Sequence, residues 1–267
     1  MILQTELRGN KVSDNLKIWD SFGKTDPTYT KSNGHGRNAS TSITPMYMVK
    51  LATKALGPIG EGWGYLVKDE RFDNGKPIVL VPGDKSKGTL PTYMMDNGSI
   101  VFEKIHTLLL EMWIKDKSNT FLQFGHTKYS YLTKNGDYFV DDEYGKKSLT
   151  DAMTKCLSLI GVCSDIYMGE FDDKNYQEVA KLENDLKKAD NKDTEYANKV
   201  EEFNDFIKDR IKAMELCPNF DSMAKVYGLA ANKIDREAPI LGIKPEEAKS
   251  PLDNKFFELE KKHKGDK

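Results

Sequence analysis

The sequence predicts an α+β protein, in which an antiparallel β-sheet built from hairpins is packed by helices and followed by a helical C-terminal region. Three observations support this fold class. Residues 100–145 hold β-prone runs separated by turn residues. A helix with one apolar face follows at 148–160, and the chain beyond it shows helical periodicity among dense charges. We therefore expect a core domain of mixed helix and strand at 1–176 and a helical region at 177–267.

The composition limits the number of domains and the class of protein to expect. The chain has 267 residues, a formal net charge of −2 and 38% hydrophobic residues, which suits one globular domain with an appendage or two small domains. No apolar run approaches the length of a membrane span, and the first ten residues do not resemble a signal peptide. The three cysteines form no C-x-x-C pair, so we expect reduced thiols in a cytoplasm. The histidines have no metal-ligand spacing to a cysteine, so we expect no metal and no other cofactor.

The N-terminal segment combines cations with aromatic rings. A short helix is expected at 13–22, followed by a loop at 24–43 that is rich in Gly, Asn, Ser and Thr. The loop carries the cations Lys31 and Arg37 together with the rings of Tyr29 and His35. Cations that reach phosphates, interleaved with rings that stack on bases, suit a groove for a single nucleic-acid strand. A surface loop with incidental cations explains the same residues.

The next helix should begin at Pro45 and end at Gly57. Its Lys50 and Lys54 are four residues apart and fall on the face opposite the apolar residues. Around this helix the chain is basic, whereas the later helical part is acidic. Between Lys24 and Lys54 there are five bases and one acid, a sum of +4, and residues 170–215 hold 14 acids and 9 bases, a sum of −5. A polyanionic partner is therefore expected for the N-terminal part only.

A strand around Trp63 should emerge from a Gly-rich turn. Residues 73–99 then form a loop-rich excursion with one short strand at 77–81. The excursion contains GDKSKGT at 83–89, which resembles a phosphate loop but lacks a Lys-Ser/Thr pair directly after the second Gly. We therefore do not expect an ATPase.

Two hairpins are predicted next. The run at 100–115 turns through 116–119, and a second hairpin turns at Asn135-Gly136, a dipeptide typical of a type I′ turn. The second hairpin carries Lys128 and Lys134 near two tyrosines. These cations either line a nucleic-acid groove or belong to an ordinary sheet surface, and the sequence favours neither interpretation.

The central helix should begin at Ser148, whose S-x-x-D spacing to Asp151 is that of an N-cap, and Gly161 should end it. Its apolar face is typical of a helix that covers a sheet. Lys155 lies on its polar face, and Lys146 and Lys147 precede its start, an arrangement that would place cations over a groove.

The C-terminal region is expected to be helical. Residues 174–216 predict one long amphipathic helix or a helical hairpin, and a further helix is expected at 221–234. A Pro-punctuated turn at 238–252 should then precede a short helical tail at 254–264. Solvated charged helices, each packed by one apolar stripe, explain this composition.

Three stretches together resemble one protein family. Residues 29–64 resemble the loop, helix, Gly-containing turn and Trp that open the annealing domain of the single-strand annealing proteins. Residues 105–125 resemble their central antiparallel hairpin, and residues 148–176 their Thr-Asp helix with the following Asp-Lys-Asn-Tyr segment. This superfamily contains phage recombination proteins of the Red-beta and Erf kinds and the eukaryotic Rad-fifty-two annealing protein. The resemblance covers residues 15–176.

The resemblance implies ATP-independent binding of single-stranded DNA and annealing of complementary strands in bacteriophage homologous recombination and DNA repair. It implies no enzymatic activity and no membrane, a place in the cytoplasm of a bacterial host, and subunits that form a ring or helical filament. DNA would lie in a positively charged groove, and the C-terminal helices would serve oligomerisation or dock a phage exonuclease or the host single-strand binding protein. The residues expected to contact DNA are Lys31, His35, Arg37, Lys50, Lys54, Lys128, Lys134, Lys146, Lys147 and Lys155.

Within that set, Lys155 falls where the family helix carries a base that contacts the DNA backbone. Thr154 and Ser158 stand where the eukaryotic member has further bases. Two other functions stay open: a structural or assembly protein that reuses the fold, and a single-strand protector that does not anneal. A nuclease is disfavoured because the tight acidic groups, at 141–143 and 172–173, lack a Lys or His placed for metal-dependent cleavage.

Overall fold

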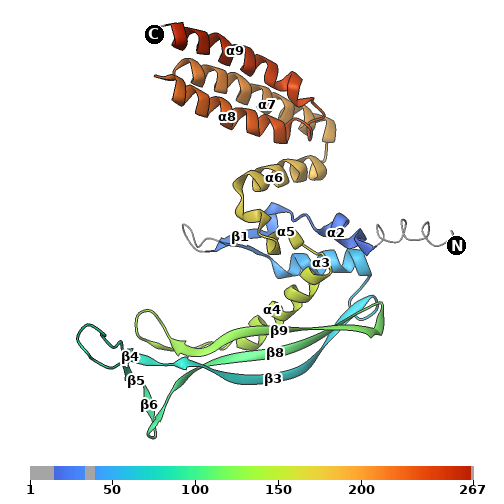
Figure 1. Cartoon of the computed structure of the whole chain (residues 1–267). Helices are drawn as coiled ribbons and strands as arrows, with labels where there is room; N and C mark the ends of the chain where they lie inside the picture. The colour runs from blue at the N-terminus through green and yellow to red at the C-terminus, as the bar shows by residue number, and fades with distance from the viewer. Residues whose placement is uncertain (1–14, 34–39, 266–267) are drawn as a thin grey trace, which may run out of the picture. The chain divides into compact units, whose positions relative to one another are not determined.

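The computed structural model describes residues 15–33 and 40–265 (Figure 1), and the chain forms two compact units. The sheet unit consists of the chain up to residue 25 together with residues 42–168. The helical unit consists of residues 26–41 and 169–267. The boundary expected at residue 176 thus differs from the one observed after residue 168, and a segment expected in the core belongs to the helical unit.

An antiparallel sheet forms the centre of the sheet unit. Its strands are β3 (Trp63–Pro77), β8 (Phe102–Ile114), β9 (Asp116–Leu132) and β10 (Tyr138–Val140), in the order β10-β9-β8-β3. The strands expected around Trp63 and at 100–115 and the two predicted hairpins are present, but the first hairpin turns at Lys115, and residues 116–119, which were predicted as its turn, belong to β9. The α+β class predicted from the sequence, with antiparallel strands and a helical C-terminal region, is confirmed.

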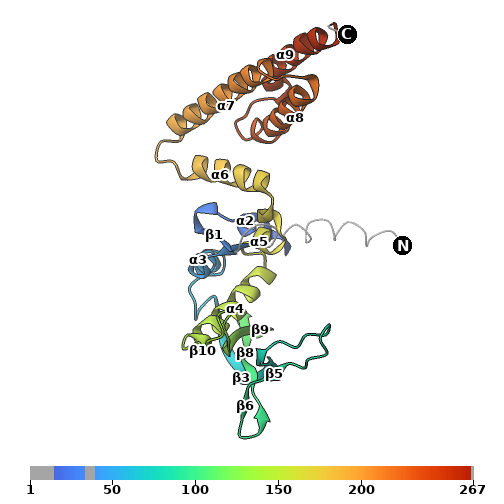
Figure 2. The ribbon, with the colours of Figure 1, turned by 90° about the vertical axis from the view of Figure 1, so that its left-hand side faces the viewer.

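Within the described residues this sheet is accompanied by α2 (Lys17–Phe22), α3 (Pro45–Leu56) and α4 (Tyr144–Leu159), and the short α5 (Ser164–Tyr167) follows them. Figure 2 shows α4 lying along one face of the sheet. Alternate residues of β8, including Leu108 and Leu110, share a buried core with Ala152 of α4 and Met48 of α3. Gly125 of β9 has no side chain where α4 crosses, and an added Cβ would lie 1.9 Å from the Ser148 carbonyl oxygen.

The start of α4 differs from the prediction, whereas its end does not. The helix begins at Tyr144, so Ser148 lies in its second turn and is not an N-cap. Ser148 is fully buried and its Oγ lies 2.9 Å from Nδ1 of His106. The predicted end is confirmed, since Gly161 has a left-handed φ of 98° directly after the helix.

Among the described residues, the Asn-Gly turns at 97–98 and 135–136 differ from each other. At the β9–β10 turn only Gly136 has a positive φ, 90°, and the Thr133 N–H donates to the Asp137 oxygen. This geometry is a three-residue loop with a left-handed glycine, so the predicted type I′ turn is wrong there. At Asn97-Gly98 both residues have positive φ, 47° and 77°, which makes that turn the type I′ hairpin.

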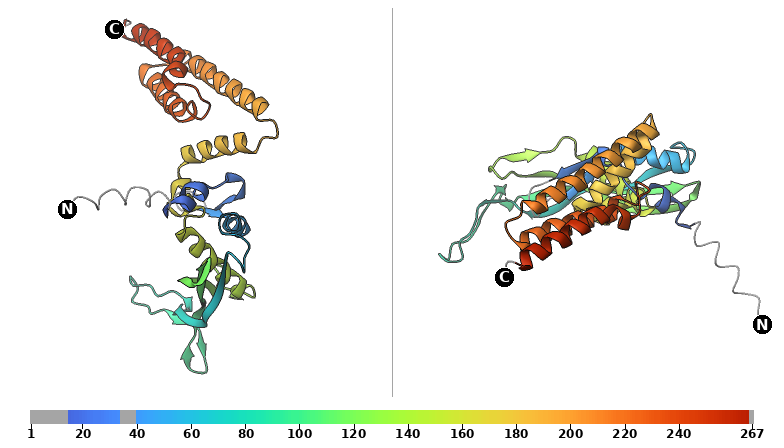
Figure 3. Two further views of the ribbon diagram at one scale, coloured as in Figure 1. Left: turned by 90° about the vertical axis from the view of Figure 1, so that its right-hand side faces the viewer. Right: turned by 90° about the horizontal axis from the view of Figure 1, so that it is seen from above.

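Between β3 and β8 the chain leaves the sheet as an ordered ribbon, residues 78–101, which we call the arm. The arm contains β4 (Val79–Val81) paired with β5 (Thr92–Tyr93), and β6 (Met95–Asp96) paired with β7 (Ser99–Ile100). The short strand predicted at 77–81 is therefore present, but the rest of the excursion is more regular than the predicted loop. Figure 3 (left) shows the arm projecting beyond the sheet.

The helical unit contains η1 (Pro27–Tyr29), β1 (Thr30–Asn33), η3 (Glu170–Asp172), α6 (Lys174–Lys188), α7 (Lys192–Glu215), α8 (Phe220–Glu237) and α9 (Pro245–Gly265), and β2 (Ser40–Ile43) pairs with β1. The segment at 24–43 was predicted as a loop, and this is partly wrong because it holds η1, β1 and β2. The alternative of a helical hairpin at 174–216 is the one observed.

A buried core joins the last three helices, α7 to α9, which run side by side (Figure 3). Phe203, Ile234 and Leu252 each contribute from a different helix. The prediction of a Pro-punctuated turn up to 252 is wrong, since α9 begins at Pro245 and contains Pro251. Pro251 lies in its second turn, where the burial of α9 against α8 offsets the lost hydrogen bond.

Candidate nucleic-acid interface

Helix α3 presents two predicted cations to solvent. Pro45 occupies its first turn and Gly57, with a φ of 99°, ends it. The helix buries Met48 and Ala52, which leaves Lys50 and Lys54 exposed one turn apart on the other side. Within the described residues neither lysine forms an ion pair. Lys54 Nζ lies 6.0 Å from the centre of the Phe22 ring.

The two lysines at the start of α4 each have an acidic partner. Lys146 Nζ lies 2.8 Å from Glu143 and Lys147 Nζ lies 2.7 Å from Asp141. The hydrogen bond between Lys147 and Asp141 raises the pKa of the lysine and lowers the pKa of the carboxyl. A phosphate that bound either lysine would have to compete with its carboxylate.

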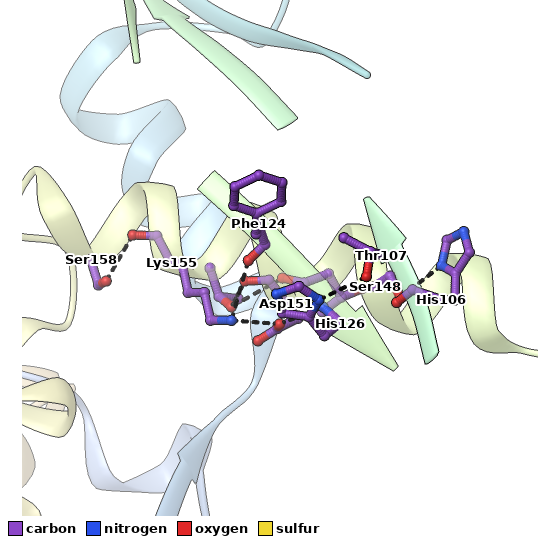
Figure 4. A network of polar contacts seen from close by, with 10 residues as sticks. His106, Thr107, Phe124, His126, Ser148, Asp151, Lys155 and Ser158 are labelled. Carbon is purple, nitrogen blue, oxygen red and sulfur yellow. Dashed lines mark hydrogen bonds and ion pairs between the residues drawn. The ribbon is translucent and has the colours of Figure 1, made fainter. Parts of the chain in front are cut away.

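Lys155 closes an edge of the sheet (Figure 4). Its Nζ donates to Asp151, at 2.7 Å, and to the backbone carbonyl of Phe124, at 3.2 Å. Asp151 in turn accepts the backbone N–H of His126 at 3.0 Å. The Phe124 carbonyl and the His126 N–H point away from β8, so they would be unpaired at this edge of β9. The side chains of Lys155 and Asp151 pair with them instead of a further strand. Lys155 and Asp151 therefore have a structural role that the sequence pattern did not indicate.

The second hairpin carries its two predicted cations in different settings. Lys128 Nζ lies 3.2 Å from the buried Glu103 and 5.3 Å from the centre of the Tyr131 ring. Lys134 lies in the β9–β10 turn and is exposed. Tyr129 packs on Tyr144, with ring centres 5.0 Å apart. Lys128 and Tyr129 are thus part of the packed sheet surface.

Of the three remaining predicted residues, one lies in the described part of the chain. Lys31 is exposed on β1, in the helical unit. His35 and Arg37 fall outside the described residues. The sheet unit therefore holds seven of the ten predicted DNA contacts: Lys50, Lys54, Lys128, Lys134, Lys146, Lys147 and Lys155. Four of these seven form ion pairs: Lys128, Lys146, Lys147 and Lys155.

A buried polar contact lies beneath α4 that the sequence did not predict. His106 is fully buried, and its two ring nitrogens each lie 2.9 Å from a partner, Ser148 Oγ and Glu70 Oε1. The Phe72 and Tyr144 rings pack against the imidazole at 5.2 and 4.7 Å. The alternation of β8 places His106 on the core face, but nothing in the sequence identifies its partners. The contact anchors α4 to the sheet.

The acidic groups at 141–143 and 172–173 do not form a metal-binding cluster in the part of the chain that the structure describes. Asp141 is occupied by Lys147 and by the backbone N–H of Glu143. No helix among the described residues is long and apolar enough to cross a membrane.

Comparison of the chain with protein-family models, with curated proteins and with solved structures finds no match.

Proposed function

We propose that this protein binds single-stranded DNA and anneals complementary strands without ATP. One observation carries the proposal: the three stretches that resemble the annealing family pack around one core. Met48 of α3, Trp63 of β3, Leu110 of β8 and Cys156 of α4 all belong to that core. Segments of all three stretches that are far apart in the sequence thus contribute to one core, while residues 29–41 and 169–176 of the same stretches belong to the helical unit.

Within that proposal, α3 supplies the first phosphate contacts. Lys50 and Lys54 are exposed, one turn apart, and bound to no carboxylate within the described residues. A phosphate therefore replaces only water and counterions there, and counterion release drives binding. At Lys146, Lys147 and Lys155 the same contact would also break an ion pair, so these residues rank behind α3.

Annealing follows from charge neutralisation. Lysines that hold the phosphates of one strand reduce its repulsion for a second strand, and they leave the bases free because phosphate contacts carry no sequence information. Base pairing then supplies the free energy, so neither ATP nor a metal is required and the protein acts as a binding scaffold in the host cytoplasm, not as an enzyme. The α7–α9 bundle is proposed to serve subunit contacts or to dock an exonuclease or single-strand binding protein.

The test is annealing of two complementary fluorescent oligonucleotides without ATP or metal, at low and at moderate salt. We expect the protein to accelerate annealing over the spontaneous rate. Binding without acceleration would leave a single-strand protector. An absence of binding at both salt concentrations would contradict the proposal and favour an assembly protein that shares only the fold.

A further inference from the structure

The arm exposes an apolar surface that it cannot cover by itself. Its exposed apolar side chains are Val79, Leu80, Val81, Leu90, Met95 and Ile100, and Leu90 is 87% exposed. The arm is nevertheless ordered by its backbone, since Ile78 donates to Val101 and accepts from Met94, both at 2.9 Å. A two-stranded ribbon of this size is marginally stable alone in water. An ordered ribbon with this much exposed apolar surface indicates a packing partner.

The sheet has a second apolar surface, which we call the outer face. It consists of the side chains of β3, β8 and β9 that alternate with the core residues and so point away from α4. Leu66 and Leu122 flank Glu111 across the three strands, and Phe124 lies beside Leu109. Leu66, Leu122 and Phe124 are 58%, 50% and 42% exposed.

Both surfaces carry little net charge. On the outer face Arg71 is paired with Asp69 and Asp73, and Lys68 lies 3.4 Å from Glu111. On the arm Lys85 and Lys87 are balanced in number by Asp84 and Asp96, and Lys87 lies 3.4 Å from Asp84. Neither surface therefore attracts a polyanion, and two copies of the chain would not repel each other there. The partner expected for the arm and for the outer face is therefore an apolar protein surface of low net charge.

The geometry keeps the arm of one chain away from the outer face of that chain. The arm leaves the sheet after Pro77, whereas Leu66 lies about 35 Å back along β3. The β6–β7 hairpin points away from the side of the sheet that α4 covers, and the arm extends past the end of the strands (Figures 1 and 2). Each chain thus presents one apolar arm and, toward the other end of the strands, the exposed apolar part of the outer face around Leu66 and Leu122.

We propose that the arm packs on the outer face of a second copy of this chain. Such a contact joins different surfaces, so it leaves an arm and a face free at the ends and continues into a ring or filament. The inference extends the proposed function, in which a row of subunits holds the strand. It is tested without DNA, so its failure and a failure of DNA binding can be told apart.

The experiment is sedimentation velocity of the full chain and two variants. The arm variant is Leu80→Asp with Leu90→Asp, and the face variant is Leu66→Asp with Leu122→Asp. Because all four side chains are at least half exposed, the substitutions bury no charge in the monomer. Phe139→Asp with Val140→Asp is the matched control, since these β10 residues are similarly exposed but belong to neither surface.

We expect the wild-type protein and the control to assemble beyond dimers, and each variant alone to self-associate roughly 100-fold more weakly, as loss of central apolar contacts predicts. A mixture of the two variants should form a 1:1 dimer, because the intact face of one accepts the intact arm of the other. A monomeric wild-type protein, variants that still assemble, or a mixture that stays monomeric would each overturn the proposal.

Discussion

The contact between α4 and the sheet depends on Gly125, and replacing it with alanine should destabilise the sheet unit strongly. The new Cβ would lie 1.9 Å from the Ser148 carbonyl oxygen and 2.8 Å from the Ala152 nitrogen. Both are backbone atoms of a helix, so no side chain can rotate away, and α4 must move off the sheet. Overpacking of this kind costs about 1–3 kcal/mol or more.

Movement of α4 would also loosen the neighbouring hydrogen bonds to Phe124 and His126, each worth about 0.5–1.5 kcal/mol. We therefore expect Gly125→Ala to lower the free energy of unfolding by about 2–6 kcal/mol, the sum of these contributions. The measurement is urea unfolding followed by tryptophan fluorescence. All three tryptophans, at positions 19, 63 and 113, belong to the sheet unit and report on it selectively.

Gly145→Ala is the matched control, because an added Cβ there meets no atom within 4 Å and the residue lies in the first turn of the same helix. Its free energy of unfolding should change by less than about 1 kcal/mol, toward greater stability. A Gly125→Ala protein as stable as the control would refute the packing of α4 against β9.

Three further predictions concern single side chains. Lys155→Ala should lower the free energy of unfolding by about 0.5–1 kcal/mol, measured by urea unfolding, and should leave DNA affinity nearly unchanged because the lysine serves the β9 edge. Burial acts to raise the pKa of Asp26, but hydrogen bonds from Lys188 and Thr28 outweigh it and hold that pKa below the usual 3.8. The ionised carboxylate should therefore stabilise α6 above pH 3.8, and this stability should be lost as the pH falls through the lower pKa that Asp26 has in the folded protein. Hydrogen exchange of the α6 amides measures this loss. Burial raises the pKa of Cys156 and of Cys163 to about 12, so a thiol reagent at pH 8 should label only the third cysteine of the native protein.

Each of these predictions has a result that would contradict it. A large loss of DNA affinity in a stable Lys155→Ala protein would return α4 to the interface. An Asp26→Asn variant with the same pH dependence of exchange as the wild-type protein would show that Asp26 does not set it. Rapid labelling of all three cysteines would mean that the core around α4 opens readily.

Periodicity and turn residues predicted the elements that bury a regular apolar stripe. Helix α3 lies between Pro45 and Gly57 as expected, and α4 ends at Gly161 because only a residue tolerant of a left-handed φ fits there. The start of α4 was misplaced because Ser148 matches an N-cap pattern. Its hydroxyl instead satisfies a buried histidine from a strand 42 residues earlier, which no local pattern reports.

The candidate site was predictable only as a set of cations. A sequence shows that Lys147 and Lys155 are basic, but the carboxylate and carbonyl that hold them are brought close by the fold. The same limit applies to Pro251, whose helix is stabilised by packing against α8 and not by local propensity. Long-range partners, which local patterns do not encode, therefore decide which predicted cations stay available for a phosphate.

The most direct test of the account is the salt dependence of binding to a fluorescent single-stranded oligonucleotide, measured by anisotropy. If Lys50 and Lys54 hold phosphates, a Lys50→Ala, Lys54→Ala protein should lose about 1.4 from the slope of log K against log salt, about 0.7 for each contact. A Lys146→Ala, Lys147→Ala protein, with the same change in charge, should keep nearly the wild-type slope. An unchanged slope in the α3 variant together with a reduced slope in the α4 variant would contradict the account and place the strand on α4.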